Sequence, residues 1–201
     1  MSDCGEYELG RRCTQKKSSV KKVAIFGNTG AGKSTLARKL AAVTGLPLYP
    51  LDLIQWRVGG APVPHEEYLR THAELLGREA WIIDGYGDRD SAWERFSAAD
   101  TLVCIDLPLI THFAWVTKRF IAWGLAGKLP EGYPEGSPLL ASAVSNYRTA
   151  WRCHRWLTPQ YRRLVAEERH RKQVHHLRSP AEIAAFLAAV QMERPGQEGA
   201  A

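Results

Sequence analysis

Short, mostly apolar segments alternate with longer amphipathic segments along this chain. A helix shows apolar positions every three or four residues, whereas a buried strand needs only a short apolar run. Strands are predicted at 23–26, 47–51, 81–83, 101–105 and 173–177. Helices are predicted at 36–43, 65–77, 91–98, 110–125, 139–156, 159–169 and 180–190. Strands that alternate with helices in this way indicate an α/β fold with a doubly wound parallel five-stranded sheet.

The segment 101–105 is apolar at nearly every position, which is typical of a parallel strand covered by helices on both faces. A chain of 201 residues is long enough for one such domain. We place this domain at 20–190. The tails at 1–19 and 191–201 are polar and lack periodicity, so both are expected to be disordered.

The composition is that of an ordinary globular protein, with 45% hydrophobic and 24% charged residues. No apolar run approaches the roughly 18–20 residues that span a bilayer. The N-terminus lacks the apolar core of a signal peptide, so a cytoplasmic location without a membrane partner is expected. The formal net charge of +6 suits an anionic partner, either nucleotide phosphates or nucleic acid. The oligomeric state stays open.

Cysteines and histidines show no metal-binding pattern. The four cysteines are widely spaced, and Cys104 lies in a predicted strand, where a small core residue is expected. His65 and His72 fall on one predicted helix without forming an H-E-x-x-H motif. Both histidines are therefore expected to be solvated.

The segment between the first strand and the first helix fits the P-loop pattern G-x-x-x-x-G-K-[ST] at every fixed position. Its nine residues are Gly27, Asn28, Thr29, Gly30, Ala31, Gly32, Lys33, Ser34 and Thr35. Glycines let the backbone turn tightly, so that loop amides and the start of a helix face a phosphate group. Lys33 is expected to reach the β- and γ-phosphates of a nucleoside triphosphate, and the Ser34 hydroxyl to bind Mg²⁺.

Aspartates follow three of the predicted strands. Asp52, Asp84 and Asp106 each come directly after a short apolar segment. Ligands in doubly wound folds bind at the carboxyl ends of the strands, where these carboxylates should lie close to the P-loop. Three of them around one P-loop predict a site for Mg²⁺ and a phosphoryl acceptor. Asp84 and Asp106 are both candidates for the metal.

Missing motifs exclude several P-loop classes. A Ras-type GTPase carries N-K-x-D, yet neither Asn28 nor Asn146 is followed by lysine. Motor and transporter ATPases place a glutamate after the strand-end aspartate, whereas Asp84 is followed by glycine and Asp106 by leucine. Without a glutamate to polarise water, transfer to a bound acceptor is favoured over hydrolysis.

Four further motifs narrow the family. They are Leu-Asp-x-x-x-Trp at 51–56, Val-Pro-x-Glu-Glu-Tyr at 63–68, Ile-Ile-Asp-Gly at 82–85 and Ile-Asp-Leu-Pro at 105–108. With these motifs the chain resembles the adenylate-kinase-related P-loop kinases, and most closely the bacterial group called DNA topology modulation proteins. The resemblance covers roughly residues 21–190. It implies a fold of the nucleoside/nucleotide-kinase type with a helical lid insertion at about 118–170, and transfer of the γ-phosphoryl group of Mg-ATP to a small acceptor.

The resemblance also implies roles for single residues. Similar kinases use an aspartate in the place of Asp52 to orient or deprotonate the acceptor hydroxyl. Arg89 keeps the position of an arginine that binds the acceptor or its phosphate, although Tyr86, Gly87 and Asp88 before it depart from the family pattern. Asp84 or Asp106 would hold the waters of the metal.

Arginines recur at roughly helical spacing in the predicted helix 139–156. Arg148, Arg152 and Arg155 could share one face and form a lid over the transferring phosphoryl group, or they could be an ordinary solvated face. Trp151 and Trp156 could stack on a base, but buried packing is the stronger expectation for both.

The acceptor is left open between a nucleoside monophosphate, a nucleoside and a small hydroxylated metabolite. A second hypothesis is an ATP-binding regulatory protein that acts on nucleic acid through a basic helical face between Arg148 and Lys172. It is the weaker of the two, because no recognised nucleic-acid motif is present and Glu167 and Glu168 interrupt the basic run.

Overall fold

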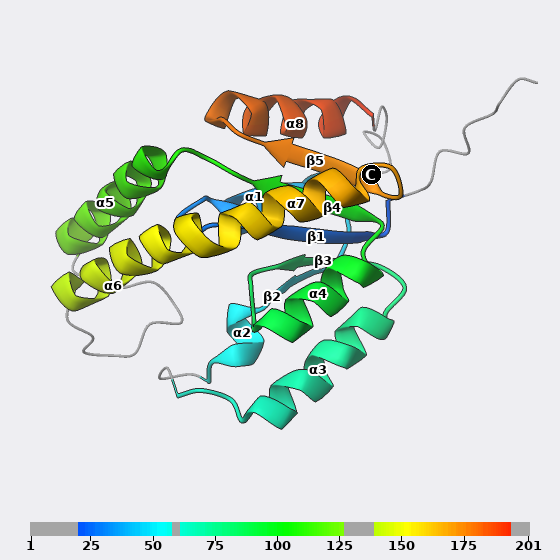
Figure 1. The fold of residues 1–201 in the computed structure, drawn as a ribbon, viewed down its shortest axis with the longest axis horizontal. Helices are drawn as coiled ribbons and strands as arrows, with labels where there is room; N and C mark the ends of the chain where they lie inside the picture. The colour runs from blue at the N-terminus through cyan, green and yellow to red at the C-terminus, as the bar shows by residue number, and fades with distance from the viewer. Residues whose placement is uncertain (1–19, 58–60, 127–138, 194–201) are drawn as a thin grey trace, which may run out of the picture.

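The computed structural model of the protein describes residues 20–57, 61–126 and 139–193. Its centre is a five-stranded parallel sheet with the order β2-β3-β1-β4-β5 (Figure 1). The strands are β1 (Lys22–Gly27), β2 (Leu48–Pro50), β3 (Trp81–Asp84), β4 (Thr101–Ile105) and β5 (Gln173–Leu177). The predicted doubly wound parallel sheet is confirmed.

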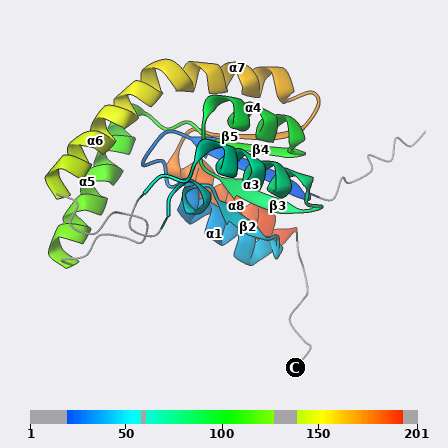
Figure 2. The same ribbon diagram turned by 90° about the horizontal axis from the view of Figure 1, so that it is seen from below.

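Helices cover both faces of this sheet (Figure 2). The helices are α1 (Lys33–Thr44), α2 (Asp52–Gln55), α3 (His65–Gly77), α4 (Arg89–Ala98), α5 (Leu109–Ala126), α6 (Leu139–Arg152), α7 (Thr158–Glu168) and α8 (Pro180–Met192). A π-helical turn, η1 (Cys153–Leu157), lies between α6 and α7. Helices α1 and α8 pack on one face of the sheet, α4 and α7 pack on the other, and α3 lies against α4.

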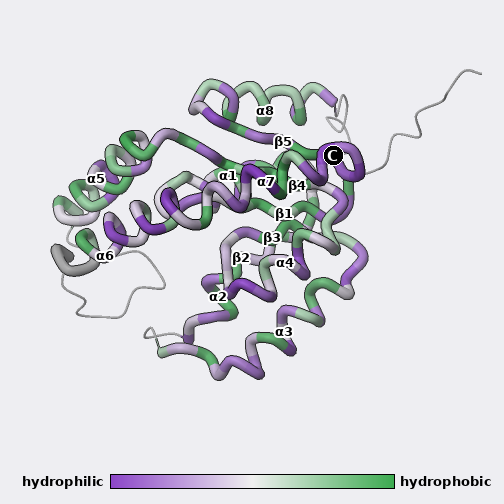
Figure 3. Tube along the Cα trace, in the orientation of Figure 1, coloured by the Kyte–Doolittle hydropathy of each residue, from purple (hydrophilic) through white to green (hydrophobic). Residues whose placement is uncertain are grey.

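The core divides into two layers because side chains alternate along each strand. On β1, Val23 and Ile25 pack toward α1 and α8, while Ala24 and Phe26 pack toward α4 and α7. All four side chains are fully buried. Figure 3 shows the central strands in green, with purple positions concentrated on α3, α4, α6 and α7. Both faces of the sheet are therefore apolar, as the continuous apolar strand at 101–105 predicts.

Helices α5 and α6 lie side by side and extend beyond the edge at which the strands end (Figures 1 and 2). The rings of Phe113 and Tyr147 meet edge to face with centroids 5.4 Å apart. Arg119 Nη2 donates to Asn146 Oδ1 over 3.0 Å. This pair overlaps the segment of about 118–170 that the family resemblance assigns to a lid. Within the described ranges no helix, α5 included, is long and apolar enough to cross a bilayer.

The structure corrects several predicted boundaries. The helices expected at 139–156 and 159–169 form one unbroken path, because η1 continues the backbone spiral and Pro159 stands in the first turn of α7, where no amide donor is required. The short helix α2 was not predicted, and α8 runs to Met192, inside the expected tail. The expected tail at 1–19, and residues 194–201 of the tail expected at 191–201, lie outside the described residues.

Candidate phosphotransfer site

The P-loop joins the end of β1 to the start of α1, as predicted. Gly27 adopts φ +148°, and a Cβ at this position would lie 2.3 Å from the Ile105 carbonyl oxygen of β4. Gly32 adopts φ +78° directly before the first helical residue, Lys33. L-residues with a side chain avoid both conformations, so glycine is required at these turns.

Backbone amides converge inside the loop. The Thr29 amide donates to Asn28 Oδ1 over 2.7 Å, and the Ala31 amide donates to the Asn28 carbonyl over 3.3 Å. The amides of Gly30, Gly32 and Lys33 make no hydrogen bond with any residue that the structure describes. Free amides at the start of a helix, together with its positive dipole end, are suited to binding an anion.

Lys33 and Ser34 begin α1. Lys33 is half-buried, and its Nζ donates to the Asn28 carbonyl over 2.9 Å. Ser34 and Thr35 follow in the first turn, and both are exposed. The ammonium group therefore lies over the mouth of the loop, with the Ser34 hydroxyl one residue further along the helix.

Helices from the later part of the chain pack against the P-loop. Asn28 is 2% exposed, and its Nδ2 donates to the Ala150 carbonyl of α6 over 2.9 Å. His112 of α5 is 1% exposed; burial, and then the charge of Lys33, lower its pKa from 6.5 to about 4. Cys153 of η1 lies against the Thr29 amide, and burial raises the pKa of its thiol. Residues of α5, α6 and η1 therefore lie against the P-loop.

Asp84 ends β3 beside the start of α1. Its side chain is 3% exposed and lies close to the side chain of Ser34. Burial raises the pKa of this carboxyl group, while the nearby Lys33 charge and the Ser34 side chain act in the opposite direction. Asp52, the first residue of α2, is exposed and close enough to raise the pKa of Asp84 by charge repulsion. The structure therefore brings Lys33, Ser34, Asp52 and Asp84 together.

Asp106 ends β4 but has other partners. Arg162 of α7 binds both of its oxygens, with Nε donating to Oδ2 over 2.7 Å and Nη2 to Oδ1 over 3.0 Å. His176 Nε2 lies 2.9 Å from the same Oδ2. The Arg162 and His176 hydrogen bonds outweigh burial and hold the pKa of Asp106 below its usual value. Of the two predicted metal candidates, Asp84 is the one that meets Ser34.

The loop between Asp84 and Arg89 is fixed by an arginine that the sequence did not reveal. Arg95 of α4 is fully buried, and its Nη2 donates to the carbonyls of Gly85 and Tyr86, both over 3.0 Å. Arg89 is the first residue of α4 and is exposed. The backbone beside the predicted acceptor position is therefore held from inside the protein.

His72 completes this buried network, so the expectation that it is solvated was wrong. It is 0% exposed, and its Nε2 lies 3.3 Å from Arg95 Nη1. Burial, and then the Arg95 charge, lower the pKa of His72 from 6.5 to about 4. A neutral ring therefore presents a lone pair to Arg95. The sequence did contain a signal for this burial. Tyr68, His72 and Leu75 have helical spacing, and together they form the buried face of α3.

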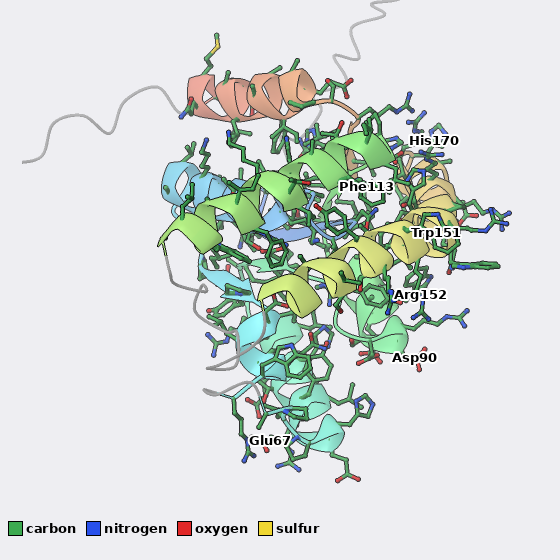
Figure 4. The ribbon with its side chains drawn as sticks, turned by 90° about the vertical axis from the view of Figure 1, so that its left-hand side faces the viewer. Glu67, Asp90, Phe113, Trp151, Arg152 and His170 are labelled. Carbon is green, nitrogen blue, oxygen red and sulfur yellow. The ribbon has the colours of Figure 1, made fainter. Side chains whose placement is uncertain are left out.

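The arginines of the expected lid are exposed. Arg148 and Arg152 lie in α6, and Arg155 lies in η1, where its guanidinium stands 5.7 Å from the Trp156 ring. No ion pair among the described residues involves any of the three. Figure 4 labels Arg152 beside Trp151 at the end of α6.

The expectation that both tryptophans are buried was wrong. Trp151 is 51% exposed and Trp156 is 66% exposed. Trp151 lies in the last turn of α6 and Trp156 lies in η1. Neither ring contributes to the core.

The oxygen-bearing side chains beside the P-loop are better suited to Mg²⁺ that is bound together with nucleotide phosphates than to a metal ion held by the protein alone. Within the described ranges no group of three or more His, Cys, Asp and Glu residues could hold an ion. Mg²⁺ keeps several waters and usually binds one or two carboxylates together with substrate phosphates. The Ser34 hydroxyl and the Asp84 carboxylate, next to free P-loop amides, fit that requirement.

Comparison with known proteins identifies fold neighbours. No family model and no curated protein matches the chain. The shikimate kinase from Acinetobacter baumannii, solved with shikimate, aligns at a TM-score of 0.53 and 18% identity, over 89% of this chain and 97% of that one. A sugar kinase from a Janibacter species aligns at 0.43 and 15% identity, over 87% and 91% of the two chains. A gluconokinase from Sinorhizobium meliloti aligns at 0.43 and 15% identity, over 86% and 94%. This chain has the fold of the P-loop kinases.

Proposed function

We propose that this protein is an ATP-dependent phosphotransferase that moves the γ-phosphoryl group of Mg-ATP to a small acceptor. The observation that carries the proposal is the meeting of Lys33, Ser34, Asp52 and Asp84 at one edge of the sheet. These side chains come from three separate strand–helix junctions, so their meeting is not a consequence of the P-loop alone. A cation, a hydroxyl and two carboxylates are the groups that phosphoryl transfer requires.

On the nucleotide side, the free amides of Gly30, Gly32 and Lys33 bind phosphate oxygens, and the Lys33 ammonium binds the β- and γ-phosphates. Ser34 would ligate Mg²⁺, and Asp84 would hold a water of the metal, because its carboxylate lies close to the Ser34 side chain. When bound, Mg²⁺ neutralises charge that develops on the transferring group.

On the acceptor side, Asp52 accepts the proton of the attacking hydroxyl. The acceptor oxygen bonds to the γ-phosphorus while the bond between that phosphorus and the bridging oxygen breaks, which releases ADP. Arg89 begins α4 next to the loop that Arg95 holds, where its guanidinium can bind a negative group of the acceptor. Asp52 is exposed, so an acceptor can reach it from solvent.

Closure over the phosphates rests on the α5–α6 pair and η1. Arg148, Arg152 and Arg155 supply positive charge there, and none of them is neutralised by an ion pair with a described residue. Arginine contacts to a transferring phosphoryl group contribute roughly 10³–10⁵ in rate in other systems.

The acceptor class is a nucleoside, a nucleoside monophosphate or a small hydroxylated metabolite. The motifs at 51–56 and 82–85, which carry Asp52 and Asp84, resemble those of the DNA topology modulation group, and this resemblance supports the proposal.

The test is ADP release from Mg-ATP across a panel of these three acceptor classes. We expect one class to stimulate turnover strongly. Lys33→Ala should abolish the stimulation and Asp52→Asn should reduce it at least about tenfold, since general acid–base groups contribute roughly 10²–10⁴ in rate.

Two matched variants control for loss of surface charge. Lys39→Ala removes an exposed lysine from the same helix as Lys33, and Asp90→Asn removes an exposed carboxylate from α4 (Figure 4). Both should keep full turnover. Tight ATP binding without stimulation by any acceptor would overturn the proposal, and a salt-dependent interaction with DNA would then support the regulatory hypothesis.

A further inference from the structure

Asn28 joins the P-loop to a helix that packs against it. The residue is 2% exposed, and its Nδ2 donates to the Ala150 carbonyl of α6 over 2.9 Å in a buried hydrogen bond. Its Oδ1 accepts from the Thr29 amide over 2.7 Å. Because one partner is a carbonyl and the other is an N–H group, only this orientation of the side-chain amide satisfies both. The side chain is therefore fixed between two segments that lie 122 residues apart in the chain.

The backbone of Asn28 binds the lysine that is expected to contact the phosphates. Its carbonyl accepts from Lys33 Nζ over 2.9 Å and from the Ala31 amide over 3.3 Å. In the proposed function the Lys33 ammonium binds the β- and γ-phosphates, so it must share or release this carbonyl when a nucleotide binds. A shift of the Asn28 peptide group passes to its side chain and from there to Ala150, because the residue is buried and protein interiors are close-packed.

The hydrogen bond to Ala150 is a directional contact beside an apolar one. Gly30 lies against α5, where a Cβ on this glycine would be 2.6 Å from Val116 Cγ2. Among the described residues, no other P-loop side chain makes a hydrogen bond with α5 or α6. Apolar contacts are non-directional, whereas hydrogen bonds have narrow angular limits. Asn28 is therefore the contact that determines the position of α6 relative to the loop.

Ala150 lies close to the arginines of the expected lid. It precedes Trp151, which Figure 4 labels near the end of α6, and the π-helical turn η1 begins three residues after it. Short π-helical turns are frequent at functional sites. Arg148, Arg152 and Arg155 lie two residues before, two residues after and five residues after Ala150. A displacement of Ala150 therefore moves the arginines to which the proposed function assigns closure over the phosphates.

We propose that Asn28 is a positioning residue, which couples nucleotide binding in the P-loop to the placement of α6 and η1. This inference rests on the nucleotide site of the proposed function. The side chain is too buried to reach a phosphate or an acceptor, so Asn28 acts through Ala150 and not on the reacting atoms. Loss of the hydrogen bond should leave nucleotide affinity nearly unchanged and slow the transfer step, because ATP binding would no longer place the closure arginines.

The experiment measures amide hydrogen exchange with and without saturating Mg-ATP, in the absence of any acceptor. In the native protein, Mg-ATP should slow exchange both at 27–35 and at 144–157. In Asn28→Ala and in Asn28→Asp, it should slow exchange at 27–35 only. Asn28→Asp is close to isosteric and keeps an acceptor for the Thr29 amide, whereas Asn28→Ala adds no charge. A result that both variants share therefore reports the loss of the Nδ2 donor.

Thr117→Val is the matched control. It removes a hydrogen bond between α5 and α6, from Thr117 to the Tyr147 hydroxyl, that does not reach the P-loop, so the response at 144–157 should persist. Turnover gives a second readout. With an acceptor that stimulates ADP release, both Asn28 variants should lower kcat about tenfold or more and keep the KM for ATP within about threefold, whereas a damaged P-loop would raise that KM.

Three results would overturn the proposal. One is a slowing of exchange at 144–157 that is the same in Asn28→Ala as in the native protein, and another is the absence of this slowing in the native protein. The third is its loss in Thr117→Val, which would show a general loosening of the α5–α6 pair. Exchange is measured without an acceptor, so the proposed phosphotransfer can fail separately. A missing acceptor response, with the exchange response intact, would refute the phosphotransfer alone.

Discussion

Arg95 provides the sharpest test of how the fold holds the acceptor side of the site. The perturbation is Arg95→Leu, which keeps a side chain of moderate size in α4 and removes every donor. In the native protein this guanidinium binds the Gly85 and Tyr86 carbonyls at 3.0 Å and faces His72 Nε2 at 3.3 Å. No other hydrogen bond from a described residue reaches those two carbonyls. The variant therefore leaves one buried and one part-buried carbonyl without a hydrogen-bond donor.

The expected cost follows from two opposing effects. Each stranded acceptor costs about 1–3 kcal/mol, and the hydrogen bonds of a charged donor are at the upper end of that range. Against this, burial lowers the pKa of Arg95, so removing the charge recovers part of its desolvation cost. The result is a net destabilisation of about 3 kcal/mol. Arg95→Lys keeps the charge but cannot reach both carbonyls, so we expect a loss between that of the leucine variant and the native protein.

The assay is urea unfolding at neutral pH, followed by circular dichroism. The control is Arg70→Leu, an exposed arginine of the neighbouring α3, which should change stability by less than about 0.5 kcal/mol. The same variants should be tested for acceptor turnover, where Arg95→Lys should raise the acceptor KM more than the ATP KM. A loss below about 1 kcal/mol for Arg95→Leu would refute the argument, because both carbonyls would then have found other donors.

Three further substitutions test the same region. His72→Gln should make the free energy of unfolding less sensitive to acid. The pKa of His72 is about 4 in the folded protein and 6.5 in the unfolded chain, so up to about 3 kcal/mol of stability is present above pH 6.5 and is lost as the pH falls toward 4. Urea unfolding between pH 4 and pH 7 would measure this loss in both proteins. Gly87→Ala should destabilise the fold by about 1–3 kcal/mol in urea, because the residue has φ +75° and a Cβ would lie 2.1 Å from Tyr68 Oη; an unchanged midpoint would contradict this. Asp84→Asn should leave the melting temperature equal or higher, since burial disfavours the ionised form, while Mg-ATP turnover falls about 10²-fold or more; retained turnover would exclude Asp84 from the metal site.

The sheet and the position of the P-loop between β1 and α1 were readable from sequence because their signals are local. Each strand is a short apolar run, and the P-loop is a contiguous motif with its own strand and helix. Only boundaries differ, as at β2, where the structure has Leu48–Pro50 against a predicted 47–51. Local backbone preference and burial agree in these segments, so little depended on tertiary contacts.

The buried network around Arg95 was missed because charge was taken as a sign of exposure. Ser91, Ala92, Arg95 and Phe96 form the buried face of α4, so the helical spacing contained the signal. Helical spacing can show that Arg95 is buried, but it cannot show which groups Arg95 binds. Arg95 is stabilised by carbonyls ten and nine residues earlier and by a histidine 23 residues earlier, and only the fold brings these together.

The hydrogen-bond partners of Asp106 were missed for a related reason. Asp106 binds Arg162 and His176, which lie 56 and 70 residues further along the chain. No local pattern connects an aspartate after one strand with a histidine in an edge strand. The strand order is needed first, because only the pairing of β4 with β5 places His176 beside Asp106.

The strand order also explains why two similar strand-end aspartates differ. β1 and its P-loop lie between β3 and β4, so Asp84 meets the start of α1, whereas Asp106 faces β5 and α7. Burial raises the pKa of Asp84, while hydrogen bonds from Arg162 and His176 lower that of Asp106. A carboxylate already bound by an arginine fork has little left to offer a metal. The Asp84 side chain has no such fork among the described residues, so its oxygens can bind a metal-bound water. The carboxyl end of the sheet is thereby divided, with phosphotransfer proposed on the β2–β3 side and the hydrogen-bonded network of Asp106 on the β4–β5 side.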